Sequence, residues 1–151
     1  MPDRSDARQV VLQLLYEDDL NPDRPSKRDE EFLRSELDGH RALIDFARSL
    51  LEGVRKERDQ LDEALACRAQ NWTIDRMAVT DRNTLRLGAF ELLHTDAPGP
   101  VVVNESVEVA KRFGSSESAG FVNAILDRLR EEVGRESTSS SDQGSPGEEQ
   151  S

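Results

Sequence analysis

The amino-acid sequence predicts an all-α protein that ends in a disordered acidic tail. Most segments place apolar residues three and four positions apart, the spacing that gathers them on one face of a helix. Charged residues make up 34% of the chain, hydrophobic residues 35% and aromatic residues 5%. This balance suits amphipathic helices with hydrated outer faces and disfavours a large β-sandwich.

The N-terminal segment is the first with this spacing. Ser5 or Asp6 can serve as the N-cap of a helix that ends before Asn21 and Pro22. Its apolar stripe consists of Ala7, Val10, Val11, Leu14 and Leu15. The polar residues 21–28 include two prolines and predict a loop.

Three further helices are expected before residue 70. A short helix covers residues 30–37, and Asp38 or Gly39 opens a longer one. The inner stripe of the longer helix consists of Leu43, Ala47, Leu50, Leu51 and Val54. Leu61, Ala64 and Leu65 continue the spacing in a fourth helix.

A central helix follows a break in the pattern at Asn71, Trp72 and Thr73. Thr73 or Thr80 can act as an N-cap there. The apolar residues of the central helix are Leu85, Leu87, Ala89, Leu92 and Leu93, and the segment ends at residues 98–100, which read Pro-Gly-Pro. Trp72 is the single tryptophan, and beside a helix end we expect it to anchor the core.

Two helices are expected after residue 100. The valine-rich stretch 101–109 is compatible with a strand, but its polar residues have helical spacing, and we favour a helix with Gly114 as its C-terminal cap. The last helix carries Phe121, Val122, Ile125, Leu126 and Leu129, and it frays near Gly134. Residues 136–151 have no large apolar side chain to offset the entropy of ordering, so we expect disorder there.

We therefore expect one helical domain over residues 1–135 and a tail over residues 136–151. All 20 Lys and Arg residues lie in the domain, which has a net charge of −7, and the tail adds −4. Strong non-specific nucleic-acid binding needs many cations that face phosphates. The acidic domain argues against such binding, so any RNA contact should be local or shared with a partner.

Disulfide, zinc and membrane sites are not expected. Cys67 is the single cysteine, no signal peptide is recognisable, and no apolar run reaches the ~18 residues of a membrane span. His40 and His94 lack a second ligand at metal-binding spacing, and no phosphate-binding loop is present. We expect a cytoplasmic protein with no cofactor, no bound metal and no catalytic activity.

A polar group in the central helix has two interpretations. Asp81, Arg82 and Asn83, with Arg86 one turn later, could contact a ligand. Helix capping and surface charge explain them more simply, because residues on one helix share a face only at spacings of three or four.

Two further candidates also remain open. Arg4 and Arg8 lie on successive helical turns and could reach phosphates, although acidic neighbours make a solvated helix face the simpler interpretation. Phe121 is either a core residue or a ring that stacks on a base near a helix N-terminus, where backbone N–H groups can donate to a phosphate.

Five longer blocks of sequence carry a more specific pattern. They are Ala7-Arg8 with Leu12-Gln13-Leu14-Leu15-Tyr16 and Asp18-Asp19, Asn71-Trp72 with Arg76-Met77, residues 81–93, residues 103–114 and residues 121–127. In this order and spacing they resemble the proteins of the NusB family, over roughly residues 5–133.

The resemblance implies an all-α fold of about seven helices in two small bundles. It also implies a non-enzymatic role in ribosomal-RNA transcription antitermination. Family members pair with NusE, which is also a small-subunit ribosomal protein. The pair binds boxA RNA as part of the RNA polymerase antitermination complex.

The same resemblance implies which residues lie at each interface. Tyr16 and Asp81 would face NusE. The residues near RNA would be Arg4, Arg8, Glu117, Phe121 and, as a weaker candidate, Arg86. Family members often begin with a cluster of arginines, whereas this chain has only Arg4 and Arg8 there, among acidic residues. We therefore expect the partner to supply most of the attraction to RNA. The alternative is a protein-interaction module or homodimer without direct RNA binding.

Overall fold

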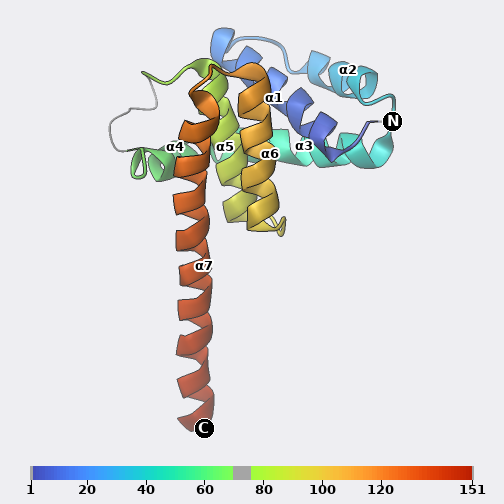
Figure 1. The fold of residues 1–151 in the computed structure, drawn as a ribbon. Helices are drawn as coiled ribbons and strands as arrows, with labels where there is room; N and C mark the ends of the chain where they lie inside the picture. The colour runs from blue at the N-terminus through green and yellow to red at the C-terminus, as the bar shows by residue number, and fades with distance from the viewer. Residues whose placement is uncertain (1, 70–75, 151) are drawn as a thin grey trace.

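The computed structural model describes the backbone of residues 2–69 and 76–150, and the side chains of residues 2–69 and 76–135. The described residues form seven α-helices and no strand (Figure 1). The helices are α1 (Arg4–Leu20), α2 (Lys27–Glu36), α3 (Arg41–Lys56), α4 (Arg58–Ala66), α5 (Val79–His94), α6 (Gly99–Phe113) and α7 (Ser118–Gln150). The expected all-α fold with about seven helices is confirmed.

The central helix α5 joins two groups of helices. On one side α5 packs against α1, α3 and α4, and on the other it packs against α6 and α7, which also contact each other. Figure 1 shows α5, α6 and α7 side by side, with α3 running roughly at right angles to them and extending to the right of α6. This arrangement confirms the expectation of two small helical bundles, which share α5.

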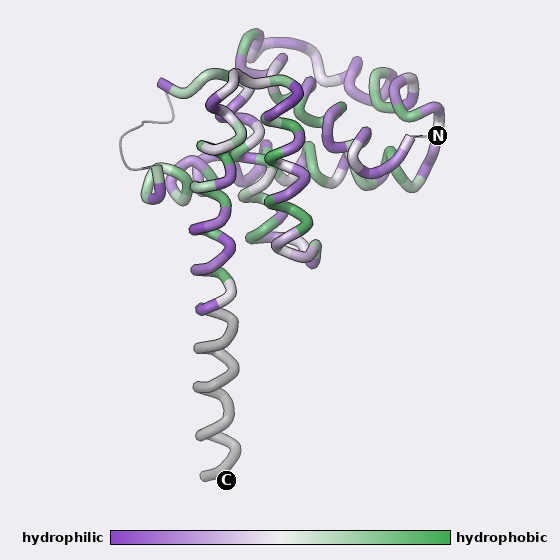
Figure 2. Tube along the Cα trace, in the orientation of Figure 1, coloured by the Kyte–Doolittle hydropathy of each residue, from purple (hydrophilic) through white to green (hydrophobic). Residues whose placement is uncertain are grey.

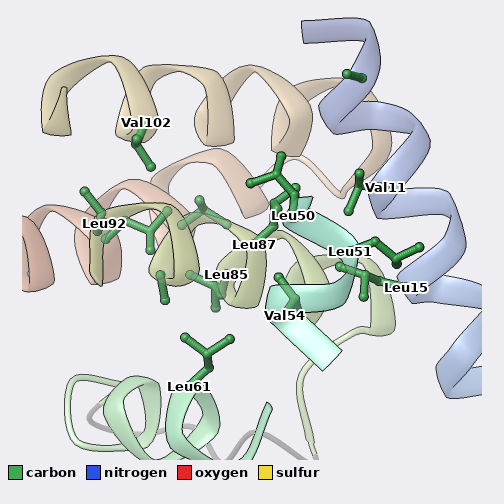
Figure 3. Close-up of a cluster of buried hydrophobic side chains, with 14 of the residues drawn as sticks. Val11, Leu15, Leu50, Leu51, Val54, Leu61, Leu85, Leu87, Leu92 and Val102 are labelled. Carbon is green, nitrogen blue, oxygen red and sulfur yellow. The ribbon is translucent and has the colours of Figure 1, made fainter. Parts of the chain in front are cut away.

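One hydrophobic core runs through both groups. Figure 3 shows Val11 and Leu15 of α1 facing Leu51 and Val54 of α3, with Leu85 of α5 beside them. Each of these side chains is at most 3% exposed. Figure 2 shows hydrophobic and hydrophilic residues alternating along the helices, as amphipathic helices require. Within the described part of the chain, no helix is both long enough and apolar enough to span a membrane.

The start of α1 lies earlier than the sequence predicts. Asp3, rather than Ser5 or Asp6, is the N-cap, because its extended backbone lets its carboxylate accept the Asp6 N–H at 3.0 Å. The Asp6 carboxylate accepts the Asp3 N–H in return, at 2.8 Å. This reciprocal pair is a capping box, and it satisfies two N–H groups that the helix itself leaves without acceptors.

The turn between α2 and α3 also corrects two expected caps. Asp38 and Gly39 have left-handed φ angles of 52° and 68°, which belong to the turn that ends α2. His40, rather than either of them, occupies the N-cap position of α3. The loop before α2 is also shorter than expected, since α2 begins at Lys27.

The boundaries of α5 and α6 differ in a similar way. Ala78 is the N-cap of α5, so Thr80 lies inside the first turn and is not a cap. The other expected cap, Thr73, and the expected core anchor Trp72 lie outside the described residues. Helix rather than strand is confirmed for residues 101–109, and Gly114 is the C-cap of α6 as expected.

The last helix buries the side chains that the sequence predicts. Val122, Ile125, Leu126 and Leu129 are each at most 3% exposed. The bounds of α7 extend past Gly134, where fraying is expected. The expected disordered tail concerns residues 136–151, whose side chains lie outside the described part, and it stays a prediction together with the domain boundary at residue 135.

Gly88 lies where α5 packs closely against both α6 and α7. A Cβ atom added there would lie 2.6 Å from Cδ1 of Leu126 in α7 and 2.8 Å from Oγ of Ser106 in α6. Gly120 also lies in α7, but an added Cβ there would meet nothing within 4 Å.

Replacing Gly88 by Ala should therefore lower the free energy of unfolding by about 1–3 kcal/mol, because the extra methyl group overpacks the contact between the helices. Gly120→Ala is the matched control and should stabilise the protein by up to about 1 kcal/mol, since alanine favours a helix. Urea unfolding followed by circular dichroism measures both. Equal stability of the two variants would contradict close packing at Gly88.

Candidate functional site

An apolar groove runs beside the C-terminal half of α1. Its volume is about 570 Å³. It is lined by Leu12, Gln13, Leu14, Tyr16, Glu17, Arg24, Arg28, Phe32, Thr80 and Phe113. Tyr16 and Phe113 are 39% and 43% exposed, and Leu20, one turn after Tyr16, is 58% exposed. Large apolar side chains gathered at one open groove are typical of a protein-binding surface.

Asp81 follows Thr80, which lines the groove, in the first turn of α5. Its Oδ1 atom is buried and accepts no hydrogen bond within the described residues. A buried acceptor without a donor costs about 1–3 kcal/mol, so a donor from a partner would relieve that cost. The structure thus brings Tyr16 and Asp81, the two expected partner residues, to one region.

The end of α1 is held by two neighbouring groups of charges. In the first, Asp18 accepts hydrogen bonds from Arg24 at 2.9 Å and from Arg55 of α3 at 2.7 and 2.8 Å. The same two arginines donate to Asp29 of α2, each at 2.8 Å. These bonds tie α1, α2 and α3 together.

Asp19 is the centre of the second group. It accepts hydrogen bonds from Asn83 at 2.9 Å and from Arg86 at 3.1 Å, both in α5. Arg82 and Arg58 form ion pairs with it at 3.2 and 3.0 Å. Burial alone would raise the pKa of Asp19, but the Asn83 hydrogen bond and the arginine charges together hold it below its ordinary value.

Arg86 lies inside this group rather than on the surface. It is 3% exposed, and it also donates to both carboxylate oxygens of Asp62 at 2.7 and 2.9 Å. Asn83 is buried as well. The expectation of surface charge at these two positions is therefore wrong, because their partners come from α1 and α4.

Arg8 is buried in a separate ion pair, away from these two groups. Its Nε and Nη2 atoms donate to the two carboxylate oxygens of Glu91 in α5 at 2.8 and 2.9 Å. The side chains are 7% and 3% exposed. Arg4 is exposed, so the two arginines expected on one outer face lie in different environments.

Arg4 contacts an aromatic ring instead. Its Cζ atom lies 4.3 Å from the centre of the Phe46 ring in α3. A guanidinium placed over an aromatic face at this distance is attracted by the ring quadrupole.

The remaining RNA candidates lie at the start of α7. Glu117 is exposed and immediately precedes the helix rather than lying in its first turn. Phe121 is half-buried and packs against the core, so the core interpretation accounts for part of its ring. The Ser118 hydroxyl accepts the Ser115 N–H at 2.9 Å and fixes the turn before α7.

Metal ligands are not grouped in the described part of the chain. No set of three or more His, Cys, Asp or Glu side chains there is placed to hold a metal ion. His94 lies 3.0 Å from Gln60 and stacks on Phe90, which explains its position structurally.

Sequence reasoning missed two aromatic residues, Phe113 and Phe46. Phe113 is the last residue of α6 and turns towards the groove. Phe46 lies beside the apolar stripe of α3, next to Ala47, and is only half-buried. An aromatic residue at the edge of a predicted stripe was the signal available for Phe46.

Comparisons with known proteins agree on one family. A family model described as NusB family matches residues 5–131. A transcription antitermination protein NusB from Anaeromyxobacter dehalogenans is 42% identical over 126 residues, which cover 83% of this chain and 89% of that protein. One from Myxococcus xanthus is 49% identical over 87 residues, which cover 57% of this chain and 62% of that protein.

Solved structures show the same fold. T. maritima NusB superposes with a TM-score of 0.78 at 30% identity and covers 87% of this chain and 92% of its own. A second match comes from a crystal structure of antitermination factors NusB and NusE in complex with dsRNA. Its TM-score is 0.74 at 25% identity, over 85% of this chain and 96% of the other.

The Arg8–Glu91 pair generates a prediction about stability. Glu91→Gln should lower the free energy of unfolding by about 3–5 kcal/mol, because it leaves the buried Arg8 charge without its counter-charge. Replacing both residues together by Met and Leu should recover most of that loss, since a well-packed apolar pair needs no desolvated charges. Thermal unfolding of the three proteins measures this, and a double variant no better than Glu91→Gln would contradict it.

The lowered pKa of Asp19 generates a prediction about pH dependence. Asp19→Asn should lower the free energy of unfolding by about 3 kcal/mol at neutral pH, because a buried charge among three arginines is removed. The stabilisation by Asp19 is present above the pKa of about 3.9 of the unfolded chain and is lost as the pH falls through the lower, folded value.

The difference in the free energy of unfolding between the wild type and Asp19→Asn should therefore become smaller in acid. Urea titrations at neutral pH and at about pH 3 measure this difference. Glu108→Gln is the control, because Glu108 forms only an exposed pair with Lys111. A difference that keeps its full size in acid would show that Asp19 does not act through its charge.

Proposed function

This chain belongs to the NusB family of transcription antitermination proteins, and we propose that it is an adaptor that joins a NusE-like ribosomal protein to boxA RNA during ribosomal-RNA transcription. Two findings carry the proposal. The family match covers residues 5–131, nearly all of the helical body, and a NusB chain of the same fold was crystallised with NusE and double-stranded RNA. The adaptor performs no catalysis and acts in the cytoplasm, within the antitermination complex of RNA polymerase.

The apolar groove is the proposed NusE surface. Tyr16 and Phe113 offer rings to an apolar side chain of the partner, and the free Oδ1 atom of Asp81 offers an acceptor to a Lys, an Arg or a backbone N–H. The net charge of −11 for the chain favours a basic partner, as a ribosomal protein is, and speeds their encounter.

Among the candidates for the proposed RNA surface, Arg4 is the one cation whose side chain is exposed. Arg4 would contact a phosphate, Glu117 would accept from a base, and the exposed part of Phe121 would stack. Arg8 and Arg86 contribute indirectly, because they are buried and hold α1 and α5 in place. The partner must then supply most of the positive charge, so the RNA is bound by the joint surface of both proteins.

The test is to titrate a boxA-type RNA into this protein, into NusE and into their mixture, at two salt concentrations. The mixture should bind at least about tenfold more tightly than either protein alone, and its affinity should fall steeply as salt rises, because phosphate contacts release counterions. A mixture that binds no better than its parts would reject the adaptor. If light scattering then showed dimers, a homodimeric interaction module would replace it.

Tyr16→Ala tests the groove within the same system. NusE affinity should fall by about 2 kcal/mol, roughly thirtyfold, if the Tyr16 ring is a central anchor. Val101→Ala is the matched control, because Val101 is 46% exposed on α6 and does not line the groove. Equal NusE affinity of the two variants would show that NusE does not bind at the groove.

A further inference from the structure

Arg4 lies at the end of α1 where the helix dipole disfavours a cation. It is the first residue of α1, directly after the N-cap Asp3, at the positive end of the helix dipole. Its side chain is exposed and forms no hydrogen bond or ion pair with the other described residues. The Phe46 ring, 4.3 Å from its Cζ atom, is the contact that remains to hold the guanidinium.

Phe46 is itself well fixed. It is half-buried and packs against the core. The Arg8 guanidinium lies 5.3 Å from the centre of the same ring, and Glu91 neutralises and holds it. Two cations near one ring repel each other, but the Glu91 carboxylate removes most of that cost, and Arg4 can occupy the outer position.

The acidic groups near Arg4 are already engaged. Asp3 and Asp6 accept each other's backbone N–H groups in the capping box. Glu105 of α6 accepts the Ser5 hydroxyl at 2.7 Å. Because these carboxylates have donors of their own, the N–H edge of Arg4 stays open to an anion from outside.

We propose that Phe46 is a positioning residue for RNA binding, holding the Arg4 guanidinium flat against its ring so that the N–H edge meets a backbone phosphate. This inference rests on the proposed function. A free arginine side chain loses rotamer entropy when it binds, and a guanidinium already stacked on a ring loses less. Phe46 thereby increases the contribution of Arg4 to RNA affinity, in a chain that has few cations at this surface.

The test is a double-mutant cycle with Phe46→Leu and Arg4→Gln, read out as boxA-type RNA affinity of the mixture with NusE. Phe46→Leu keeps an apolar side chain but removes the ring, and it should weaken RNA binding about two- to fivefold, the worth of one exposed cation–π contact. In the Arg4→Gln background it should have no further effect. Phe46→Tyr should restore wild-type affinity, because it keeps the aromatic face.

Two controls separate positioning from folding. Phe90→Leu also removes a half-buried ring, but Phe90 packs against Gly53 and His94, and RNA affinity should not change. NusE affinity measured without RNA should be the same for Phe46→Leu and the wild type. If Phe46→Leu does not fold, Phe46→Met provides a second ringless side chain and should show the same loss of RNA affinity.

The outcomes distinguish the two proposals. An unchanged RNA affinity of Phe46→Leu, or an equal loss with and without Arg4, overturns the role of Phe46 and leaves the adaptor function standing. A wild-type mixture that does not bind the RNA overturns both. A loss seen only when Arg4 is present, with NusE affinity intact, supports positioning by Phe46.

Discussion

Two adjacent carboxylates, Asp18 and Asp19, fix the end of α1, and the rest of the arrangement depends on them. Asp18 joins α1 to α3, and Asp19 joins it to α4 and α5. Such ion pairs add little net stability, because removing charges from water costs nearly as much as their attraction returns. They do penalise any other placement of α1, which would leave buried charges unpaired. The network therefore fixes geometry more than it adds stability.

That geometry matters because α1 carries parts of both proposed interfaces. Arg4 and Tyr16 lie twelve residues apart, roughly 18 Å along a straight helix. The Arg8–Glu91 pair fixes α1 to α5 near Arg4, and the Asp18 and Asp19 groups fix it beyond Tyr16. A partner bound at the groove and an RNA bound near Arg4 would thus meet a rigid rod at a fixed spacing. Scaffolding of this kind needs no moving part.

The sequence predicted the helices well, but it predicted poorly which arginines are buried and which residues they contact. Helical spacing identified the buried stripes of α1, α3 and α7, because apolar side chains at intervals of three and four must share a face. The expected caps failed at Ser5, Thr80 and Gly39 because several polar residues near each helix end could have served, and local sequence does not choose among them. Arg8 lies four residues before Leu12 and seven before Leu15, so its place on the inner face was readable. Its partner Glu91, 83 residues away, was not.

Ion pairs between arginines and carboxylates within the chain also change how the net charge acts at the surface. Arg8, Arg55 and Arg86 are engaged with carboxylates of the same chain, so each pair cancels and contributes little field at the surface. The excess of acidic residues then makes the surface potential negative, which repels RNA and attracts a basic protein. Under these conditions an exposed arginine such as Arg4 gains importance, because the few available cations must be well placed. In the proposed arrangement, the Phe46 ring orients Arg4 and so strengthens RNA binding without an additional cation.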